Sequence, residues 1–364
     1  MIAGGGTAGH VMPGLAVAQA LVAHGRAPTS IHFVGASRGL EATLVPAAGF
    51  TITLLPGRGI QRRLTPANLS ALCGIGRAFA RSVRLVRRRR PAVVLALGGY
   101  ASVPCALAAV LLRVPIVVAE QNAVPGAANR LVSRFARAVA VSFPGTPLPR
   151  STVTGNPVRP EVLAVDRARD RGAARTALGL GTERTLVVVM GGSLGALRLN
   201  RAALGAVRIW AARDDLAVRH IVGQRDWDEI MAASPTLIDG GVVYQRVRYE
   251  QDMARTLAAA DLAVCRPGSG TCFELAAVGL PSVLVPSPFV TGDHQSANAR
   301  HLERAGAAVV VADAELDADR LAAEVDRLVA DPGRLAALAK GARALARPDA
   351  AARVIELLEA SARG

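Results

Sequence analysis

The chain has 364 residues, of which 51% are hydrophobic and only 3% aromatic, and its formal net charge is +15. This length is long for one compact domain and suits two, each with its own core. The scarcity of aromatic residues argues against a nucleic-acid platform of stacking side chains. The positive charge therefore indicates an anionic substrate or membrane surface, unless it reflects an arginine-rich composition alone.

In the first half of the chain, strand-like and helix-like segments alternate. The strand-like segments are 30–35, 51–57, 92–99 and 114–120, and the helix-like segments are 13–25, 39–50 and 66–90. Such alternation is typical of βαβ units in an open, mostly parallel sheet. Only Met1, Ile2 and Ala3 precede the first glycine run, so we expect either a truncated start or an unusually short first strand.

The most apolar stretch, residues 101–122, contains Pro104, Arg113 and Pro115. These residues predict a buried helix followed by a strand, and not a membrane span. No secretory signal precedes the first glycine run, which favours a cytoplasmic protein. The cysteines occur singly, without the C-x-x-C spacing of a ligand pair, and are expected to be buried thiols in a reducing compartment: Cys73, Cys105, Cys265 and Cys272.

A Gly/Pro turn and a polar, charged stretch occupy residues 151–185, where we expect the junction between two domains. The alternation then restarts, with strand-like segments at 185–192, 217–223, 240–247, 260–268, 281–288 and 307–314. Two doubly wound α/β halves are therefore predicted. The tail, residues 348–364, is helical with no strand after it, so it is free to pack in another apolar groove.

Glycine-bearing loops recur four times, each between an apolar strand and a helix start. They read "IAGGGTAGH", "LALGGYASVP", "VVMGGSLGA" and "AVCRPGSGT", two in each half. Glycine lets the backbone approach a ligand, and the N–H groups at a helix start favour an anion such as phosphate. Because ligands bind at the carboxyl ends of parallel strands, these loops predict a cleft between the halves that takes two phosphorylated ligands, one per domain.

Gly4, Gly6 and Gly9 also match the G-x-G-x-x-G pattern of dinucleotide-binding proteins. A site for NAD needs an acidic residue about 20 residues further on, to bind the ribose. Ser37 and Arg38 stand at that place. Arg38 could accept the 2′-phosphate of NADP, so an NADP-dependent oxidoreductase remains an alternative.

Further stretches, in chain order with those loops, are "AEQNAVPG", "TGNPVR", and "CRPGSGTCFELAAVGLP" followed by "TGDHQSANARHLERAGAA". Over essentially the whole chain, these motifs resemble the MurG family of cell-wall glycosyltransferases. The resemblance implies the GT-B fold: two Rossmann-like, doubly wound parallel-sheet α/β domains that face a cleft. It implies an N-terminal domain at 1–158, a C-terminal domain at 159–346, and a final helix at about 347–364 that packs back on the first.

The resemblance also implies a reaction. The C-terminal domain would hold UDP-N-acetylglucosamine, and the N-terminal domain would hold the undecaprenyl-diphosphate-linked N-acetylmuramyl-pentapeptide, at the cytoplasmic face of the plasma membrane. The acceptor 4-hydroxyl attacks the anomeric carbon in line, UDP leaves, and a β-1,4 bond forms. Such an inverting transfer needs a base and a stabilised leaving diphosphate. No cofactor, protein-held metal or nucleic acid is required, and Asp317 and Asp319, the one D-x-D match, are expected to be solvated charges at a helix start.

Site residues follow by matching motifs. His10, which closes the first glycine loop, is the leading base or acceptor-orienting residue, with Glu120 in reserve and a purely structural His10 as the alternative. Expected donor-binding residues are Thr7, Ala8, Gly9, Asn122, Arg159, Ser193, Glu250, Ser269, Gly270, Thr271, Glu274, His294 and Gln295. Expected acceptor-diphosphate residues are Gly5, Gly6, Gly98, Gly99 and Tyr100.

Two donor residues have a clear physical rationale. Ser193, at a helix start, is placed to donate from its hydroxyl and backbone N–H to a nucleotide diphosphate, with an ordinary helix cap as the alternative. The Glu274 carboxylate can accept from both ribose hydroxyls, or can serve only as a partner of the helix dipole. The uracil is expected against the backbone near Tyr249 and Glu250.

A helix over residues 66–90 carries apolar residues at helical spacing with basic residues beside them. The residues expected to contact an anionic membrane leaflet are Leu72, Ile75, Phe79, Arg81, Val83 and Arg84. The alternative is an amphipathic helix whose apolar stripe faces the core and whose charges are solvated.

Two further functions stay open. The loop "RPGSGTCFE" departs from the family pattern at Pro267, Gly270 and Phe273, so a divergent GT-B transferase with another UDP-sugar or acceptor is one alternative. The other is a basic, non-catalytic protein that binds membrane or nucleic acid by charge, with strong salt dependence and no response to UDP-sugars.

Overall fold

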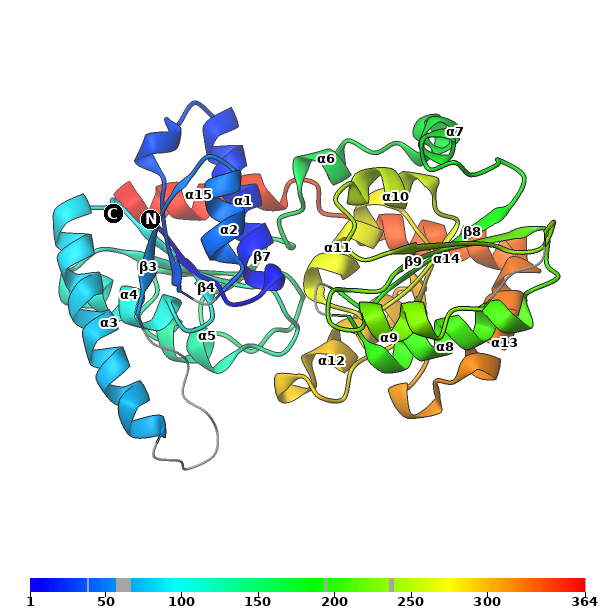
Figure 1. The fold of residues 1–364 in the computed structure, drawn as a ribbon. Helices are drawn as coiled ribbons and strands as arrows, with labels where there is room; N and C mark the ends of the chain where they lie inside the picture. The colour runs from blue at the N-terminus through cyan, green and yellow to red at the C-terminus, as the bar shows by residue number, and fades with distance from the viewer. Residues whose placement is uncertain (38, 57–66, 193–194, 236–238, 364) are drawn as a thin grey trace. The chain divides into compact units, whose positions relative to one another are not determined.

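The structure is a computed structural model that describes residues 1–37, 39–56, 67–192, 195–235 and 239–363, with the backbone alone for 67–73. The described chain divides into two compact units (Figure 1). Unit 1 comprises Met1–Arg159 and Arg347–Gly364, and unit 2 comprises Pro160–Ala346. Each unit is built on one parallel sheet with helices on its faces.

The sheet of unit 1 has the strand order β3-β2-β1-β4-β5-β6-β7, and all neighbouring strands run parallel. The strands are β1 (Ile2–Gly4), β2 (His32–Ala36), β3 (Thr51–Leu55), β4 (Val94–Gly98), β5 (Ile116–Glu120), β6 (Ala138–Val141) and β7 (Ser151–Val153). β1 has three residues, yet it pairs with β2 on one side and β4 on the other. A first strand this short therefore still occupies the middle of the sheet.

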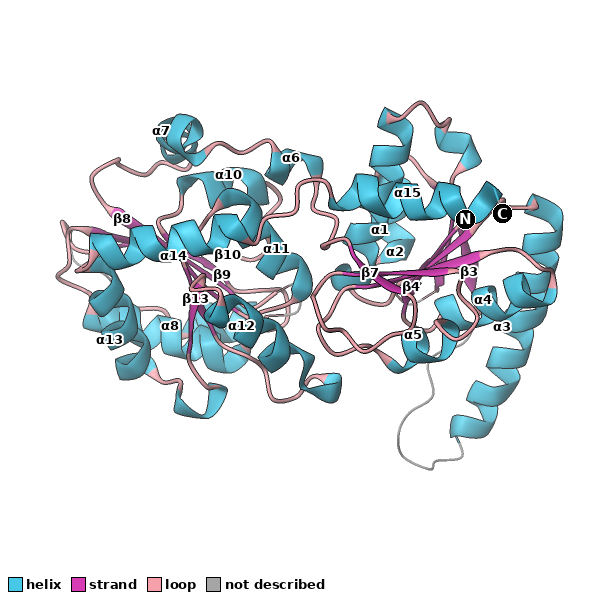
Figure 2. Ribbon diagram, turned by 180° about the vertical axis from the view of Figure 1, so that it is seen from behind, coloured by secondary structure: helices cyan, strands magenta, loops and turns pink. Residues whose placement is uncertain are grey.

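Helices cover both faces of this sheet (Figure 2). One core lies under α3 (Ala67–Arg89), α4 (Ser102–Leu111) and α5 (Ala127–Val132). The opposite core lies under α1 (Ala8–Ala23), α2 (Glu41–Ala47) and the last helix, α15 (Ala350–Arg363). α15 contributes Val354, Ile355 and Leu358 to that core, so the end of the chain completes the fold of its beginning.

The sheet of unit 2 has the order β10-β9-β8-β11-β12-β13, again with parallel neighbours. Its strands are β8 (Thr185–Met190), β9 (Leu216–Ile221), β10 (Val243–Val247), β11 (Leu262–Cys265), β12 (Ser282–Leu284) and β13 (Ala308–Val310). Its helices are α6 (Pro160–Leu163), α7 (Arg167–Ala177), α8 (Leu197–Ile209), α9 (Trp227–Ala232), α10 (Met253–Ala259), α11 (Ser269–Val278), α12 (His294–Arg304), α13 (Ala318–Val329) and α14 (Pro332–Ala344).

Both sheets reverse their strand order at a central strand, β1 in unit 1 and β8 in unit 2. In open α/β sheets, the carboxyl ends of the strands at such a switch point form the ligand site, because the flanking loops separate there. The glycine loops predicted from the sequence follow β1 and β4 in unit 1 and β8 and β11 in unit 2. Each pair of loops thus lies at the switch point of its own unit.

β6 and β7 were not anticipated, because each is short and β7 is an exposed edge strand within the stretch expected to be a junction.

Cys105, Cys265 and Cys272 are buried free thiols, as predicted. Burial raises the pKa of Cys105 and of Cys265 to about 12, so both thiols are unreactive at neutral pH. None of the helices in the described part of the chain is long and apolar enough to cross a membrane.

Candidate functional site

The loops after β1 and β4 are in backbone contact. A Cβ atom at Gly99 would lie 2.2 Å from the carbonyl oxygen of Gly5, a distance that only glycine permits. Gly98 and Gly99 also have φ angles of +95° and +78°, which side-chain-bearing residues rarely adopt. The structure therefore brings together four of the residues predicted to contact the acceptor diphosphate, the fourth being Gly6 beside Gly5.

His10 lies between these loops, in the first turn of α1. Its Nδ1 is hydrogen-bonded to the hydroxyl of Thr7, the N-cap residue of α1, at 3.0 Å. Its Nε2 lies 3.2 Å from the position that a Cβ atom at Gly98 would take. Thr7 thus orients the imidazole, and the Nε2 edge is directed to the loop after β4. Ala8 and Gly9 form the helix start between Thr7 and His10.

A buried carboxylate that the sequence did not single out holds the first glycine loop. Glu41, at the start of α2, is 1% exposed and accepts the N–H of Gly6 at 2.8 Å and that of Ala36 at 2.7 Å. The Gly6 N–H is therefore engaged within unit 1, and the contact of Gly6 with the acceptor diphosphate stays a prediction. The only sequence signal was a glutamate directly after the "SRGL" turn at a helix start.

Glu120, the reserve base, is 2% exposed at the end of β5. Its oxygens accept the N–H groups of Asn122 at 2.9 Å and Gly126 at 3.0 Å, and the side-chain amide of Asn129 at 2.9 Å. A carboxylate enclosed by these donors holds the loop from 121 to 126 in place, and this argues against Glu120 as the proton acceptor. It positions Asn122, whose amide also reaches Glu120 at 3.3 Å. Asn129 was missed because nothing in its local sequence distinguishes it from other polar helix residues.

Tyr100 follows the second glycine loop and is half-buried. Its hydroxyl donates to the carbonyl of Pro56 at 2.9 Å, and burial raises its pKa. The hydroxyl has only one hydrogen, and this contact uses it. The hydroxyl therefore has no second hydrogen to donate to a diphosphate. The contact of Tyr100 with the acceptor diphosphate stays a prediction.

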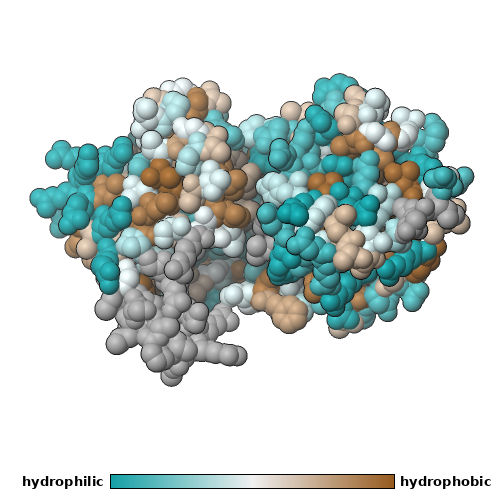
Figure 3. Space-filling model, viewed as in Figure 1, coloured by the Kyte–Doolittle hydropathy of each residue, from teal (hydrophilic) through white to brown (hydrophobic). Residues whose placement is uncertain are grey.

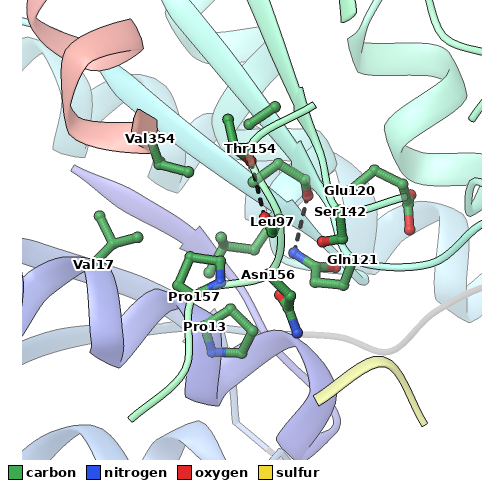
Figure 4. Close-up of a pocket in the computed structure, with 13 residues that line it drawn as sticks. Pro13, Val17, Leu97, Glu120, Gln121, Ser142, Thr154, Asn156, Pro157 and Val354 are labelled. Carbon is green, nitrogen blue, oxygen red and sulfur yellow. Dashed lines mark hydrogen bonds between the residues drawn. The ribbon is translucent and has the colours of Figure 1, made fainter. Parts of the chain in front are cut away.

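A small cavity of about 10 Å³ lies behind this loop cluster, within unit 1 (Figure 4). Pro13 and Val17 of α1, Val354 of α15, and Gln121 and Asn156 are among its lining residues. Its volume suits a single water molecule, whereas a sugar or nucleotide needs a site of several hundred Å³. This cavity is therefore not the substrate site.

The apolar stripe of α3 faces the interior in its second half. Phe79 and Val83 are half-buried and pack against the core of unit 1, and Val86 in the same stripe is 1% exposed. This packing fits the alternative of a stripe that faces the core, and the membrane contact expected of Phe79 and Val83 stays a prediction. Arg81 and Arg84 are exposed on the other face, Ile75 is half-buried, and the Leu72 side chain lies outside the described residues.

In unit 2, the candidate donor loops follow the adjacent strands β8 and β11. Ser193 lies outside the described residues. Ser269, Gly270 and Thr271 form the first turn of α11, and no atom lies within 4 Å of a Cβ position at Gly270, so the backbone there is open to a ligand. Glu274 is one turn further along α11 and half-buried, on the same side of the helix as Gly270.

Other predicted donor residues are oriented by hydrogen bonds. The Glu250 carboxylate accepts from Arg219 at 2.7 Å and from the Thr256 hydroxyl at 2.7 Å, so its side chain is engaged within unit 2. At the start of α12, Gln295 accepts the N–H of Ser287 at 2.8 Å. The ring of the neighbouring His294 is bonded to the carbonyl of Thr291 at 2.9 Å.

Two remaining predictions concern charge. Arg159 is the half-buried last residue of unit 1 before the chain enters unit 2. Asp317 caps α13 by accepting the N–H of Arg320 at 2.8 Å, the helix-start role expected of it. Among the described residues, no three His, Cys, Asp or Glu side chains converge as metal ligands.

Comparison with known families gives matches in both units. The glycosyltransferase family 28 N-terminal domain matches residues 1–141, and the glycosyltransferase family 28 C-terminal domain matches residues 186–354. Among solved structures, MurG of Acinetobacter baumannii superposes with a TM-score of 0.76 at 29% identity, over 99% of this chain and 98% of that one. A UDP co-structure of MnaA from S. aureus, 13% identical, shares the fold alone with a TM-score of 0.67, over 97% of this chain and 93% of that one.

Sequence relatives agree over the full length. A protein of Alkalilimnicola ehrlichii is 42% identical over 100% of this chain and 99% of its own, and one of Desulforudis audaxviator is 39% identical over 99% and 97%. Both are named UDP-N-acetylglucosamine–N-acetylmuramyl-(pentapeptide) pyrophosphoryl-undecaprenol N-acetylglucosamine transferase. The two parallel-sheet units and these matches confirm the predicted GT-B fold class. The chain accordingly belongs to glycosyltransferase family 28, in the MurG family of enzymes.

Proposed function

We propose that this protein transfers N-acetylglucosamine from UDP-N-acetylglucosamine to the 4-hydroxyl of undecaprenyl-diphosphate-linked N-acetylmuramyl-pentapeptide, with inversion at the anomeric carbon. The observation that supports this most is identity of about 40% over nearly the whole chain to relatives named for that transfer. In this proposal unit 1 binds the acceptor and unit 2 binds the donor, without a protein-held metal. The product is a precursor of peptidoglycan, so the reaction serves cell-wall growth, shape and division.

His10 is the proposed base. The Thr7 hydroxyl is hydrogen-bonded to Nδ1, and we assign the proton of the acceptor hydroxyl to Nε2, which faces the loop after β4. To accept this proton, Nε2 must not already carry hydrogen, so the ring hydrogen must be on Nδ1. Nδ1 then donates to the Thr7 oxygen. As the hydroxyl oxygen attacks the anomeric carbon, His10 becomes an imidazolium beside a glycine loop proposed to receive the acceptor diphosphate.

The leaving UDP carries growing negative charge as the bond to the sugar breaks. In the proposal, the start of α11 and the loop before α8 receive the donor at the switch point of unit 2. Backbone N–H groups at helix starts stabilise such charge without a metal. Glu274 is suited to accept both ribose hydroxyls, and Gln295 and Asn122 are proposed to read the sugar.

Membrane association is proposed through a surface of unit 1. Exposed arginines on the outer side of α3 supply positive charge, and hydrophilic side chains gather over the second half of this helix (Figure 3). The exposed apolar side chains Leu111, at the end of α4, and Phe135, just after α5, are 61% and 51% exposed. Because α4 packs against both α3 and α5, charge and apolar area lie on neighbouring elements, as peripheral binding to the anionic cytoplasmic leaflet needs.

The test is an assay of label transfer from radiolabelled UDP-N-acetylglucosamine to a short-chain lipid-linked muramyl-pentapeptide. Wild-type protein is expected to move label into the lipid fraction. The His10→Ala variant is expected to lose about 100-fold or more in kcat, the usual size of a general-base contribution. His24→Ala, an exposed histidine at the other end of α1, is the matched control and should retain activity.

Other results would reject parts of the proposal. Tight UDP binding without transfer would mean that another acceptor or sugar is used. Salt-sensitive membrane or nucleic-acid binding with no response to UDP-sugars would indicate a non-catalytic binder. Wild-type kcat in His10→Ala would remove His10 as the base while leaving the reaction in place.

A further inference from the structure

A continuous chain of hydrogen-bonded polar side chains runs through unit 2 from β10 to Gly195. The Tyr244 hydroxyl, on edge strand β10, is 2.8 Å from Nδ1 of His220 on β9. The other ring nitrogen, Nε2, is 3.0 Å from Oδ1 of Asn200 on α8. The Asn200 amide nitrogen then donates to Asp226 at 3.0 Å. His220 and Asn200 are 0% exposed and Asp226 is 4% exposed, so the contacts among these three are shielded from water, whereas Tyr244 is half-buried.

The direction of every hydrogen bond in this chain follows from its acceptor end. The Asn200 Nδ2 faces two oxygens, that of Asp226 and the carbonyl of Val222 at 2.9 Å, so it must be the donor. Oδ1 therefore faces His220, whose Nε2 carries hydrogen, and Nδ1 accepts from Tyr244. Burial lowers the pKa of His220 to about 4, which keeps the ring neutral at physiological pH. One tautomer of His220 satisfies the whole chain.

The acceptor end of this hydrogen-bonded chain lies against Gly195, which precedes α8. A Cβ atom at Gly195 would lie 2.8 Å from the Asp226 carboxylate and 2.7 Å from the carbonyl of Val222, and Gly195 has a φ of +85°. Arg225 pairs with Asp226 at 2.7 Å and extends to the carbonyl of Gly195 at 3.5 Å. The carboxylate therefore packs against Gly195, and it binds the guanidinium that reaches the Gly195 carbonyl.

Apolar side chains pack around this chain of hydrogen bonds. Leu204, Val222 and Ile230 form a small buried cluster, against which Trp227 and Tyr244 pack. A buried polar chain with all its members satisfied is rigid, because any rotation would leave an unpaired group in an apolar surrounding. The position of Asp226 is thus determined by residues on four separate elements.

We propose that Asp226, oriented by Asn200, His220 and Tyr244, is a positioning residue that holds Gly195, in the loop proposed to receive the donor diphosphate. This rests on the proposed function, in which that loop receives the diphosphate of the UDP-sugar. Asp226 touches the loop and not the substrate. Its loss should therefore weaken nucleotide binding without impairing the chemical step.

The experiment compares three variants of the full chain. Asp226→Asn keeps the side-chain shape and removes the charge that holds Arg225 and Asn200. Tyr244→Phe removes the far hydroxyl. Asp261→Asn is the matched control, because Asp261 accepts the N–H of Leu186 at 2.8 Å at the opposite, amino end of β8 and pairs with Arg171 and Arg175 there. UDP affinity, KM and kcat are measured together with the exchange rate of the Gly195 amide, which is bonded to Gly192 at 3.0 Å.

Asp226→Asn is expected to raise the Kd for UDP and the KM for UDP-N-acetylglucosamine about tenfold, with kcat within about twofold of wild type. The Gly195 amide should exchange about tenfold faster. Tyr244→Phe should shift the same quantities in the same direction by about two- to threefold, and Asp261→Asn should shift none of them. Wild-type Kd and wild-type exchange in Asp226→Asn would overturn the proposal.

A different result would indicate that the proposed function is wrong while the positioning role of Asp226 is still open to test. If the wild-type protein did not bind UDP, that function would be rejected. The exchange rate at Gly195 would still decide the positioning role, since it needs no nucleotide. Faster exchange only in the Asp226 and Tyr244 variants would support the positioning role of Asp226, and equal exchange in all three variants would overturn it.

Discussion

The backbone of Gly99 lies against the carbonyl oxygen of Gly5 so closely that a Cβ atom at Gly99 would come within 2.2 Å of it. The loops that follow β1 and β4 therefore support each other through backbone atoms alone. His10 is placed on this support, since its imidazole lies next to Gly98. The candidate base thus depends on the absence of side chains at two glycines.

Gly99→Ala should disrupt this support. The new methyl group meets backbone rather than a flexible side chain, and the φ of +78° is strained for alanine. Gly145→Ala is the matched control, because Gly145 has a φ of +76° and no atom within 4 Å of a Cβ position. Gly145→Ala should cost about 1 kcal/mol in the free energy of unfolding, whereas Gly99→Ala should cost more and abolish transfer. Equal losses in chemical denaturation would show that the contact with Gly5 is unimportant.

Glu41→Gln should loosen the first glycine loop. Glutamine has one acceptor oxygen where glutamate has two, so either the Gly6 or the Ala36 N–H loses its partner in a buried place. The expected loss of stability is about 1–3 kcal/mol, measured by urea unfolding. KM for the lipid acceptor should rise, because the loop proposed to bind it is displaced. Glu161→Gln, at an exposed glutamate, should change neither quantity.

Stability should fall in mild acid. Burial lowers the pKa of His220 from the ordinary 6.5 to about 4. As the pH falls, the unfolded chain takes up the proton first, so stability that is fully present above pH 6.5 is lost between about pH 6.5 and 4. The loss from this one group is about 3 kcal/mol. Burial lowers the pKa of His32 to about 4 in the same way, so both histidines contribute.

His220→Gln isolates the first of these contributions. The free energy of unfolding of the variant should depend less on pH than that of the wild type over this range, even if it is lower throughout. Identical pH dependence in both proteins would show that His220 titrates normally.

Ile355→Ala, in the last helix, should destabilise unit 1. Ile355 is 5% exposed and packs with residues of α1 and of the sheet, so its truncation leaves a cavity that costs about 2–5 kcal/mol. Glu356→Ala changes the next, exposed residue and should cost less than about 0.5 kcal/mol. Calorimetry separates the two, and equal unfolding temperatures would mean that α15 adds little to the fold.

Leu111→Asp combined with Phe135→Asp should weaken binding to vesicles that contain anionic lipid. Two charged aspartates then replace exposed apolar side chains, which opposes insertion into the membrane. Partitioning of the protein onto the vesicles should fall about tenfold or more. Ile209→Asp is the control, because Ile209 is 51% exposed on unit 2. Sedimentation with the vesicles measures all variants. Equal binding of the double variant and the control would place the membrane contact elsewhere.

The sequence predicted the architecture well because its signals are local. Apolar runs separated by amphipathic segments predict parallel strands and covering helices, and a glycine run between them predicts a loop at a strand end. Gly5, Gly98 and Gly99 were identified in this way, and each has the positive φ that its place requires. β7 was missed because three exposed residues at a sheet edge carry no such pattern.

Only the tertiary structure decided which residues form hydrogen bonds with those loops. The Gly6 N–H binds Glu41, 35 residues away, and Asn200 binds Asp226, 26 residues away. The stripe on α3 suits a core as well as a membrane, and only the structure shows that Phe79 and Val83 pack against the core of unit 1. A residue's helical or extended state depends on its near neighbours, whereas its hydrogen-bond partner depends on which distant segments the fold brings beside it. The sequence by itself therefore determined the strands, the loops and the family, and the tertiary structure decided which carboxylates hold the loops in place.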